Sequence, residues 1–558
     1  MRIRKLLRVR FVVDPFIEQE KIMAELTPMM QKYMETKEQY KDCILFYRLG
    51  DFYEMFFDDA LVASKELEIT LTGKSCGLEE RAPMCGIPYH AVEGYLSKLV
   101  SRGYKVAICE QVEDPKLAKG LVKREVIRVV TPGTNLNVQS LEAGKNNYLL
   151  SIAYTPDGIG ISAADVTTGD YYVTEVEDLK KLNDELMKYE PSEIICNEAF
   201  LVSGFDVNDL KTRLHISVNA LESHMFDDDG CRRILMKHFK VNTLIGLGVE
   251  EFPTGLLAAG ALLQYLYDTQ KTDLEHFTHI YPYLTSKYML LDSSTRRNLE
   301  LTETLREKQK RGSLLWVLDR TKTAMGGRLL RNYIEQPLID KEEMEKRLDA
   351  IQELNQDSIS RDEIREYLNP VYDLERLLSK VTYKTANPRD LIAFRNSLQM
   401  LPPIKTVLAG FQKEELAAIR EEIDGLEDIY QLIDEAIVEE PPISIREGGM
   451  IKDQFDETID HLRAAKHDGK QWLVQLEEED RERTGIKNLK IKKNNVFGYF
   501  FEVTNSYKDL VPEDYIRKQT LANAERYTTP RLKELEDTIL NAEDKLQTLE
   551  YDIFCRIR

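Results

Sequence analysis

The C-terminal end of the chain carries the pattern that most restricts its fold. Apolar side chains recur there at alternating spacings of three and four residues over 22 residues, which on an α-helix is a stripe about 33 Å long. Such a seam requires a partner helix, so the sequence predicts two long helices that pack against each other. The stripe comprises Leu532, Leu535, Ile539, Ala542, Leu546, Leu549 and Ile553.

A helix pair of this size uses only part of the 558 residues. At about 150 residues per domain, the length allows three or four domains. No Gly, Asn or Pro follows the stripe before Arg558, which is typical of a helix that continues beyond the sequence. We therefore expect the sequence to stop within a helix and to be part of a longer protein.

Residues 24–134 are predicted to form a mixed α/β domain, because helix-like and strand-like stretches alternate along them. LTPMMQKYMETKEQY (26–40) is amphipathic, whereas CILFYRLG (43–50) and YKVAICEQV (104–112) are apolar enough for buried strands. The Thr-, Pro-, Gly- and Asn-rich stretch 131–147 then predicts a linker and a domain boundary.

Residues 135–265 are predicted to form a second α/β domain. The stretches NYLLSIAYT, GIGISAADVTT and DYYVTEV are separated by the turns Asp157-Gly158 and Gly169-Asp170. Three short strands with tight turns between them predict a β-meander, which is followed by helices mixed with more strand.

The second half of the chain is predicted to be mainly helical. Helical periodicity dominates residues 266–454, and residues 455–483 form one long helix. LKIKKNNVFGYFFEVT (489–504) predicts a hairpin of two strands around Asn494-Asn495, and helix is expected to resume near residue 519. The pattern indicates a small module at 455–520 inserted between two long helices, the second of which occupies 521–558.

The composition excludes several classes of protein. The formal charge of −20 argues against a chain that coats nucleic acid or anionic membrane everywhere, so a polyanion has to meet local basic patches. No apolar run approaches the 18 to 20 residues of a membrane span, so we expect a cytoplasmic protein without a membrane partner. The seven cysteines are scattered and contain no CxxC pair, which indicates neither a disulfide framework nor a metal site.

The first 22 residues hold six basic residues and precede Met23. We expect Met23 to be the natural start and residues 1–23 to be an N-terminal extension. A basic arm that binds nucleic acid is the alternative. The opening MRIRKLLRVRFVV is interrupted by Arg8 and Arg10, so it lacks the apolar core of a signal peptide.

Four aromatic residues surround a carboxylate in the segment Gly50-Asp51-Phe52-Tyr53-Glu54-Met55-Phe56-Phe57. Aromatic clusters usually belong to a core, and at the start of a helix Phe52 and Phe56 would face inward together. In the alternative, one ring is a wedge that enters a weakened base step of DNA and stacks there. The unstacking cost is smaller where the bases are already mismatched. The residues alone leave both interpretations open.

Two basic stretches could contact a nucleic-acid backbone, although an ordinary solvated face is the alternative for each. Residues 98–128 have a local charge of +4, and residues 484–520 have a local charge of +3. The candidate phosphate contacts are Lys98, Arg102 and Lys105 in the first stretch, and Lys490, Lys492, Lys493, Arg517 and Lys518 in the second.

Two patterns resemble parts of enzyme active sites, but neither is complete. Gly73-Lys74-Ser75 resembles the end of a phosphate-binding loop, but that loop needs a Gly at position 68, which is Glu. Asp165 and Asp170 could be the first carboxylates of a two-metal nuclease site, yet Asp is common at such a turn for its turn chemistry alone. We expect no catalytic residues and no bound cofactor or metal in this chain.

A series of blocks then closely resembles the MutS family of bacterial mismatch-recognition proteins. The resemblance runs in order from about residue 24 to 558, and such multi-block agreement is highly specific. Representative blocks are FYRLGDFYEMFFDDA (46–60), APMCGIPYHAVEGYLSKLV (82–100), REVIRVVTPGT (124–134), SSTRRNLELTETL (293–305), GGRLLRNYIEQPL (326–338) and RKQTLANAERYTTPRLKELE (517–536).

The resemblance implies roles for two residues and an architecture. Phe52 would stack on a mispaired or unpaired base in the minor groove, and Glu54 would hydrogen-bond to that base. The implied domains are a mixed α/β mismatch-recognition domain (24–134), an RNase H-like connector (135–265), and a helical core with long lever helices (266–454). A clamp (455–520) and a returning lever helix (521–558) follow.

The family also implies partners and a cofactor. Its members carry a C-terminal ATPase domain that binds ATP with Mg, and this sequence stops before that domain, so we expect no ATPase activity and weakened homodimerisation. The expected partners are double-stranded DNA with mismatches or small loops and other mismatch repair proteins, in a nucleoid-associated location. A helical scaffold for repair partners, without DNA binding of its own, is the alternative function.

Overall fold

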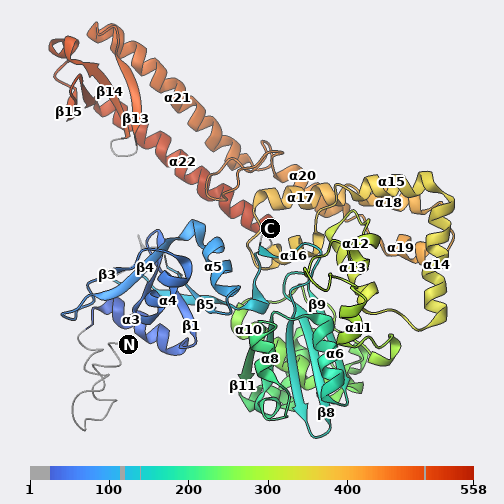
Figure 1. The fold of residues 1–558 in the computed structure, drawn as a ribbon. Coiled ribbons are helices and arrows are strands. Elements are labelled where there is room, and N and C mark those ends of the chain that lie inside the picture. The colour runs from blue at the N-terminus through green and yellow to red at the C-terminus, as the bar shows by residue number, and fades with distance from the viewer. Residues whose placement is uncertain (1–25, 114–119, 138–139, 495–497) are drawn as a thin grey trace, which may run out of the picture. The chain divides into compact units, whose positions relative to one another are not determined.

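A computed structural model describes residues 26–113, 120–137, 140–494 and 498–558 (Figure 1). The chain divides into two compact units. One unit comprises Met1–Gln356 with Asp373–Tyr383, and the other comprises Asp357–Tyr372 with Lys384–Arg558. The expected N-terminal extension lies outside the described residues.

The first domain of the N-terminal unit is built on a six-stranded sheet with the order β3-β4-β2-β1-β5-β6 (Figure 1). Strands β1 and β5 are parallel, and the other neighbours are antiparallel. Helices α4 and α5 pack on one face of the sheet, and α3 packs on the other. The elements are α3 Pro28–Gln39, β1 Cys43–Leu49, β2 Phe52–Phe56, α4 Phe57–Leu67, β3 Thr72–Lys74, β4 Ala82–Pro88, α5 Val92–Val100, β5 Lys105–Gln111 and β6 Arg124–Val130. The prediction of a mixed α/β domain is confirmed.

The aromatic segment is a strand and not the start of a helix. The two residues Gly50 and Asp51 connect β1 to β2, and Leu49 pairs with Phe52 across the hairpin. Gly50 adopts a φ of 60°, which a two-residue hairpin turn requires because its twist must match that of the strands. The strand therefore begins directly after the turn, and of the two open interpretations the helix start, with Phe52 and Phe56 one helical turn apart, does not hold.

The second sheet contains the predicted meander. Strands β7, β8 and β9 are antiparallel neighbours, and β10 and β11 continue the sheet in parallel, in the order β11-β10-β7-β8-β9-β12. Helix α10 crosses β8 so closely that a Cβ atom on Gly160 would lie 1.9 Å from the carbonyl oxygen of Thr254. The elements include β7 Leu149–Thr155, β8 Gly158–Asp165, β9 Asp170–Val176, α6 Leu179–Tyr189, β10 Glu193–Asn197, β11 Ser217–Leu221, α9 Asp228–His238, α10 Pro253–Gln270 and β12 Tyr281–Pro282.

The expected domain boundary at residue 265 falls inside α10. That helix is buried along its length and continues to Gln270, and the short strand β12 then joins the same sheet beside β9. The boundary is wrong at this point because residues 266–270, which were assigned to the helical region, are the end of the helix that covers this sheet.

The remainder of the N-terminal unit is a set of helices connected by irregular segments. They are α11 Ser293–Asn298, α12 Leu314–Leu318, α13 Ala324–Glu335, α14 Lys341–Gln356 and α16 Leu374–Thr382. The C-terminal unit begins with α15 Ser358–Leu368, α17 Pro388–Leu398, α18 Leu401–Leu408, α19 Glu414–Glu422 and α20 Glu427–Ala436. The helical character predicted for 266–454 is confirmed.

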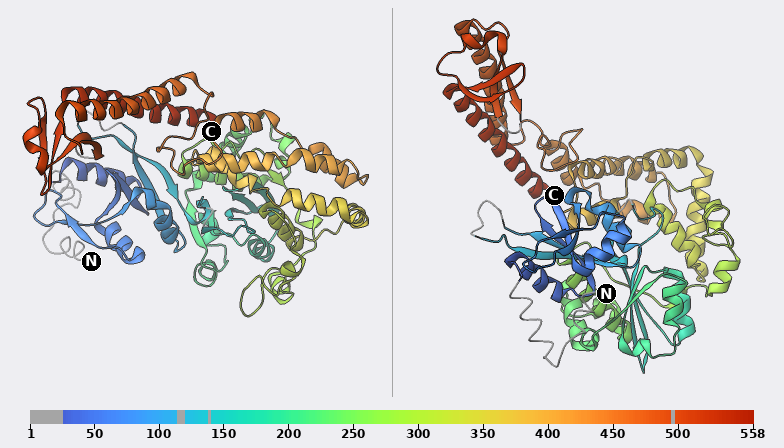
Figure 2. Two further views of the ribbon diagram at one scale, coloured as in Figure 1. Left: turned by 90° about the horizontal axis from the view of Figure 1, so that it is seen from above. Right: turned by 60° about the vertical axis from the view of Figure 1, so that its left-hand side comes forward.

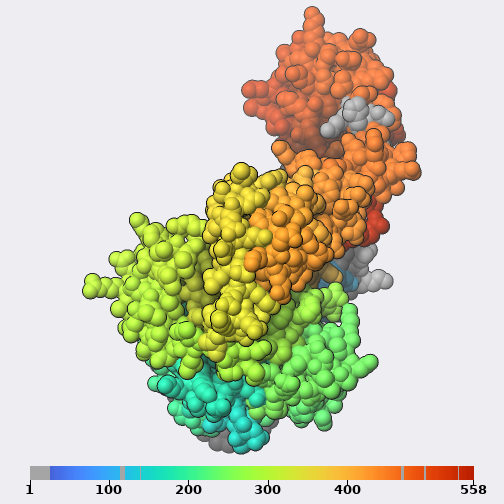
Figure 3. All heavy atoms as spheres, turned by 90° about the vertical axis from the view of Figure 1, so that its right-hand side faces the viewer, coloured from blue at the N-terminus to red at the C-terminus, as the bar shows by residue number. Residues whose placement is uncertain are grey.

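The C-terminal unit ends in two long helices that run side by side, α21 Glu457–Thr484 and α22 Pro530–Ile557 (Figures 1 and 2). Between them the chain forms a four-stranded antiparallel sheet in the order β13-β14-β16-β15. Its strands are β13 Lys490–Asn494, β14 Gly498–Thr504, β15 Ile516–Thr520 and β16 Ala524–Thr528. In the space-filling view this sheet and the helix ends form one compact body (Figure 3).

The predicted helix pair, the long helix at 455–483 and the hairpin at β13 and β14 are confirmed, although Asn495 at the centre of that hairpin lies outside the described residues. The prediction that helix resumes near residue 519 is wrong, because β15 and β16 come first. Thr529 then caps α22 by accepting a hydrogen bond from the Leu532 amide at 3.2 Å, with Pro530 in the first turn. The module boundary at residue 520 consequently cuts through the sheet.

All seven cysteines are free thiols, and six of them are buried. Burial raises the pKa of Cys43 and Cys85 to about 12, so these thiols stay protonated at neutral pH. Among the described residues, no helix combines the length and the apolar character needed to cross a membrane.

The helix pair can be tested through Ile539, which is buried between the sheet and α21. We expect Ile539→Ala to destabilise this part of the molecule by about 2–4 kcal/mol, because it leaves a cavity. Trp472 lies on α21 and reports on it when the other tryptophan is replaced (Trp316→Phe). Urea unfolding followed by Trp472 fluorescence measures the change. The half-buried Leu549→Ala is the control and should lose less; equal losses would contradict the assigned packing.

Candidate nucleic-acid interface

Strand β2 presents Phe52 and Glu54 on the same face of the first sheet, because side chains alternate along a strand. The Phe52 side chain is 47% exposed, whereas Tyr53 and Met55 on the opposite face are buried in the core. Phe56, four residues after Phe52 on the same face, is buried under α3. Of the large side chains on this strand, Phe52 alone is available to a ligand, whereas Tyr53, Met55 and Phe56 are buried in the core.

The other side of β2 holds the strand firmly in place. The Tyr53 hydroxyl donates to the Glu110 carboxylate, which also pairs with Arg48 at 3.3 Å. The Arg48 guanidinium lies 3.7 Å from the ring centre of Tyr89, and its backbone carbonyl accepts a hydrogen bond from Arg124. Burial raises the pKa of Tyr53, with the Glu110 carboxylate adding to the effect, so the hydroxyl remains a donor.

Glu54 forms an ion pair that sequence reasoning missed. The Lys74 ammonium on β3 lies 2.5 Å from Glu54 Oε2 and 5.6 Å from the ring centre of Phe56. In the sequence Lys74 stood out only within the Gly-Lys-Ser triplet. That triplet belongs to the edge strand β3 and its bend, and no helix begins after it, so it does not form a phosphate-binding loop.

The basic residues of 98–128 do not gather into one surface. Arg102 is paired with Glu66, Lys105 is paired with Asp42 at 3.1 Å, and only Lys98 of the three candidates extends from an exposed position on α5 without such a carboxylate partner in the described chain. Arg128 is half-buried and donates to the Thr134 carbonyl at 3.2 Å. The local charge of +4 therefore overstates what this stretch offers to a polyanion. Lys116 and Lys119 lie outside the described residues.

The four-stranded sheet divides the second set of candidates between its faces. Lys490 and Lys492 share one face with Arg526, and Lys492 pairs with Glu502 at 2.7 Å. Lys493 points to the other face, where its ammonium lies 3.6 Å from Glu543. On β15, Arg517 lies 3.7 Å from Glu525, and Lys518 is exposed.

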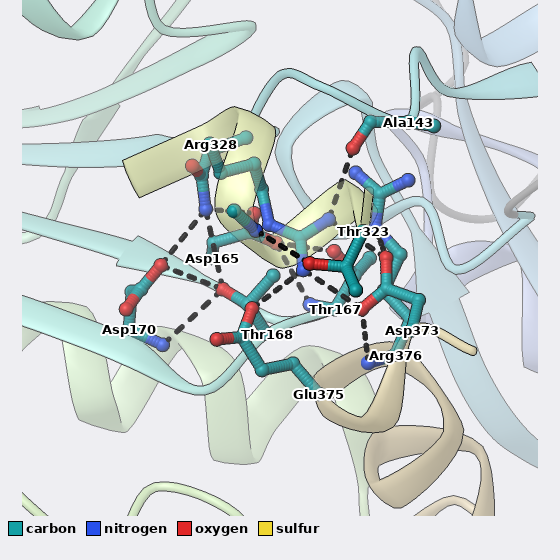
Figure 4. Close-up of polar contacts among 12 residues, drawn as sticks. Ala143, Asp165, Thr167, Thr168, Asp170, Thr323, Arg328, Asp373, Glu375 and Arg376 are labelled. Atoms are coloured by element: carbon teal, nitrogen blue, oxygen red, sulfur yellow. Dashed lines mark hydrogen bonds and ion pairs between the residues drawn. The ribbon is translucent and has the colours of Figure 1, made fainter. Parts of the chain in front are cut away.

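Asp165 and Asp170 do come together, but neutral donors hold them (Figure 4). The Asn146 amide donates to Asp165 Oδ2 at 2.9 Å and to Asp170 Oδ2 at 2.8 Å. Asp165 is buried and also accepts from the Thr167 hydroxyl at 2.7 Å. An amide directed at both carboxylates occupies the position of a cation, and the described residues contain no cluster of three or more potential metal ligands. The arrangement does not support a two-metal nuclease.

Two buried arginines lie beside these carboxylates (Figure 4). Arg328 on α13 binds Asp373 through two nitrogens, each at 2.7 Å, and donates to the Ala143 carbonyl at 3.0 Å. Arg376 on α16 donates to the Lys145 carbonyl at 2.8 Å. The segment at 142–145 is thereby fixed to both helices, so the polar cluster has a structural role.

Comparison with known proteins places these domains in a family. The family models for MutS domain I, MutS domain II and MutS domain III match residues 27–139, 147–278 and 294–558. The protein named DNA mismatch repair protein MutS in Lachnoclostridium phytofermentans is 66% identical, over 96% of this chain and 58% of that protein. Those of Ruminiclostridium cellulolyticum and Acetivibrio thermocellus are each 54% identical over 96% of this chain, and over 61% and 62% of their own lengths.

The three matches follow one another in order, so the fold is that of a multidomain protein assembled from successive MutS domains. The chain belongs to the MutS family. It spans about three fifths of the length of these relatives.

The Asp165–Asp170 pair should make the stability of the N-terminal unit depend on pH. Burial and the charge of Asp165 raise the pKa of Asp170 to about 6. The folded protein then holds a proton that the unfolded chain, with a pKa of about 3.9, releases. This contribution to stability is present below pH 4 and is lost as the pH rises through 6. We expect Asp170→Asn to reduce the pH dependence of unfolding between pH 4 and pH 7 by about 2 kcal/mol.

Urea unfolding at several pH values, followed by Trp316 fluorescence in a Trp472→Phe background, measures this slope because Trp316 lies in the N-terminal unit. The exposed turn residue Asp157 provides the control, Asp157→Asn, which should keep the slope of the parent protein. An unchanged slope in Asp170→Asn would show that Asp170 titrates normally.

Proposed function

We propose that this chain recognises mismatched or unpaired bases in double-stranded DNA at the start of mismatch repair. Phe52 stacks on the base, and Glu54 accepts a hydrogen bond from it, in the minor groove of kinked DNA. The observation that carries the proposal is the half-exposed Phe52 ring beside the Glu54 carboxylate on one face of a firmly anchored strand.

The physical chemistry of a ring suits this task. Stacking of a base on an aromatic side chain contributes about 1–3 kcal/mol and tolerates any base, so one wedge can serve many mismatches. A mismatch also lowers the cost of unstacking and kinking the duplex. A protein that binds only the kinked form therefore has a higher affinity for a mismatched duplex than for a matched one, even without base-specific hydrogen bonds.

Contacts to the DNA backbone then supply affinity without specificity. The exposed positions of Lys490 and Lys518 on the four-stranded sheet support this role for them. Lys98 extends from α5 in the same way. The other candidates would first have to release the carboxylates that they contact: Arg102, Lys105, Lys492, Lys493 and Arg517.

The remaining roles belong to the same proposal. The four-stranded sheet is the clamp, α21 and α22 are the levers, and the domain of the second sheet is an RNase H-like connector that receives other repair proteins.

One observation favours the alternative of a scaffold for partner proteins. Helix α14 exposes Met344, Leu348 and Ile351, which recur at helical spacing and are 38%, 62% and 54% exposed. A stripe of this kind is typical of a protein contact. Partner binding that persists at high salt in a chain that ignores DNA would favour this function over mismatch recognition.

The wedge predicts the effect of Phe52→Ala. We expect this variant to lose the preference for a G·T or single-base-loop duplex over its matched twin, by about tenfold or more, because stacking is removed. Much of the salt-sensitive binding to both duplexes should remain. Fluorescence anisotropy across a salt series measures both quantities. Tyr281→Ala removes an equally exposed ring from β12 and should leave the preference unchanged; an unchanged preference in Phe52→Ala would refute the wedge.

The backbone contacts predict a different signature. Lys490→Met and Lys492→Met should weaken binding to mismatched and matched duplexes equally, and each should reduce the slope of log affinity against log salt by about one unit. Lys211 lies exposed on α8 (Val207–Thr212), and Lys211→Met is a control of equal charge. A slope that the sheet variants leave at the parental value would exclude phosphate contacts at these lysines.

A further inference from the structure

The Glu54 carboxylate has unequal surroundings at its two oxygens. Oε2 accepts from the Lys74 ammonium at 2.5 Å, and this is the ion pair that the described residues give to Glu54. Oε1 accepts no hydrogen bond from the described part of the chain. Lys74 therefore fixes one oxygen and leaves the other directed away from the pair.

The route of the Lys74 side chain explains how this geometry is held. Lys74 lies opposite Ala82 on β4, while Glu54 lies opposite Gly86 on the same strand. The lysine side chain crosses the Phe56 ring, with its ammonium 5.6 Å from the ring centre, and so reaches Glu54 along the face of the sheet. The side chains of Lys74 and Glu54 are 34% and 16% exposed, which limits their freedom to separate.

Phe52 and Glu54 lie two residues apart on one face of β2, and Gly86 on β4 lies opposite Glu54. A Cβ atom at Gly86 would be in ordinary van der Waals contact with both side chains, 3.6 Å from Glu54 Cγ and 3.9 Å from Phe52 Cδ1. The ring and the carboxylate therefore stand next to each other, and Gly86 places no side chain against them. A base stacked on Phe52 would meet the carboxylate from this side.

We propose that Lys74 is a positioning residue for mismatch recognition: it binds Oε2 of Glu54, neutralises the carboxylate against the DNA phosphates, and leaves Oε1 to accept the hydrogen bond from the base. This inference rests on the function proposed above. An unpaired carboxylate is repelled by a polyanion, whereas a carboxylate paired with an ammonium is nearly neutral at the distance of the nearest phosphates. The pair therefore lets an acidic side chain work inside a minor groove.

The inference predicts a dependence between two substitutions. Lys74→Met should reduce the preference for mismatched over matched duplex by about threefold to tenfold, because Glu54 is then unneutralised. Lys74→Arg should retain most of the preference. In a Glu54→Gln background there is no charge to neutralise, so Lys74→Met should change the preference by less than about twofold.

The experiment is a double-mutant cycle on the full chain, read by anisotropy on G·T and matched duplexes across a salt series. Circular dichroism and thermal unfolding confirm that each variant is folded. Lys65→Met, an exposed lysine on α4, is the control for loss of one positive charge from the same domain and should behave as the parent protein.

Each outcome decides a different point. If Lys74→Met weakens both duplexes equally and lowers the salt slope, Lys74 is only a phosphate contact and the inference is overturned. If Lys74→Met costs the same preference in the parent chain and in the Glu54→Gln background, the inference is likewise overturned, since Lys74 would then act independently of the carboxylate. If the parent chain itself shows no preference, the proposed function fails, and the role of Lys74 fails with it.

Discussion

Two buried guanidinium groups hold the N-terminal unit together. Arg328 and Arg376 are 4% and 2% exposed, and burial together with the neighbouring Arg328 lowers the pKa of Arg376. Charges in such a place are costly unless they are paired and hydrogen-bonded. Arg328 binds Asp373 through two nitrogens, and both arginines donate to carbonyls in the segment 142–145. The segment that joins two sheets is thus fixed to two helices whose arginines come 185 and 231 residues later in the chain.

The candidate interface depends on one strand, β2, that is fixed in the core on one face and exposes a ring on the other. Tyr53 and Met55 are fixed in the core on one side of β2, and Phe52 remains half exposed on the other. A ring held in this way loses little freedom when it stacks, so more of the stacking energy is available for binding. The same strand also places Glu54 beside the ring, where Lys74 on β3 can reach it.

The periodicity of apolar residues predicted the presence of helices and strands better than it predicted where each one begins and ends. The stripe from Leu532 to Ile553 and the meander at β7–β9 follow from periods of about 3.6 and 2 residues, which each stretch displays by itself. Strands β15 and β16 were missed because each has five residues and they directly precede a strong helix. At Phe52 the sequence left two interpretations open, and the hairpin turn at Gly50 excludes the start of a helix, because a strand follows the turn directly.

The sequence by itself determined the long helix pair, the α/β character of the first two domains and the resemblance to the MutS family, because periodicity and ordered blocks are properties of the chain. The tertiary structure decided which charged side chains are available. Arg128 donates to the Thr134 carbonyl, Arg102 and Lys105 pair with carboxylates, and the Gly-Lys-Ser lysine is the partner of Glu54. The tertiary structure decides this because the partner of a charged side chain depends on which strands lie next to each other in the sheet. In the order β3-β4-β2, two residues 20 positions apart lie across one intervening strand, and no local pattern encodes that approach.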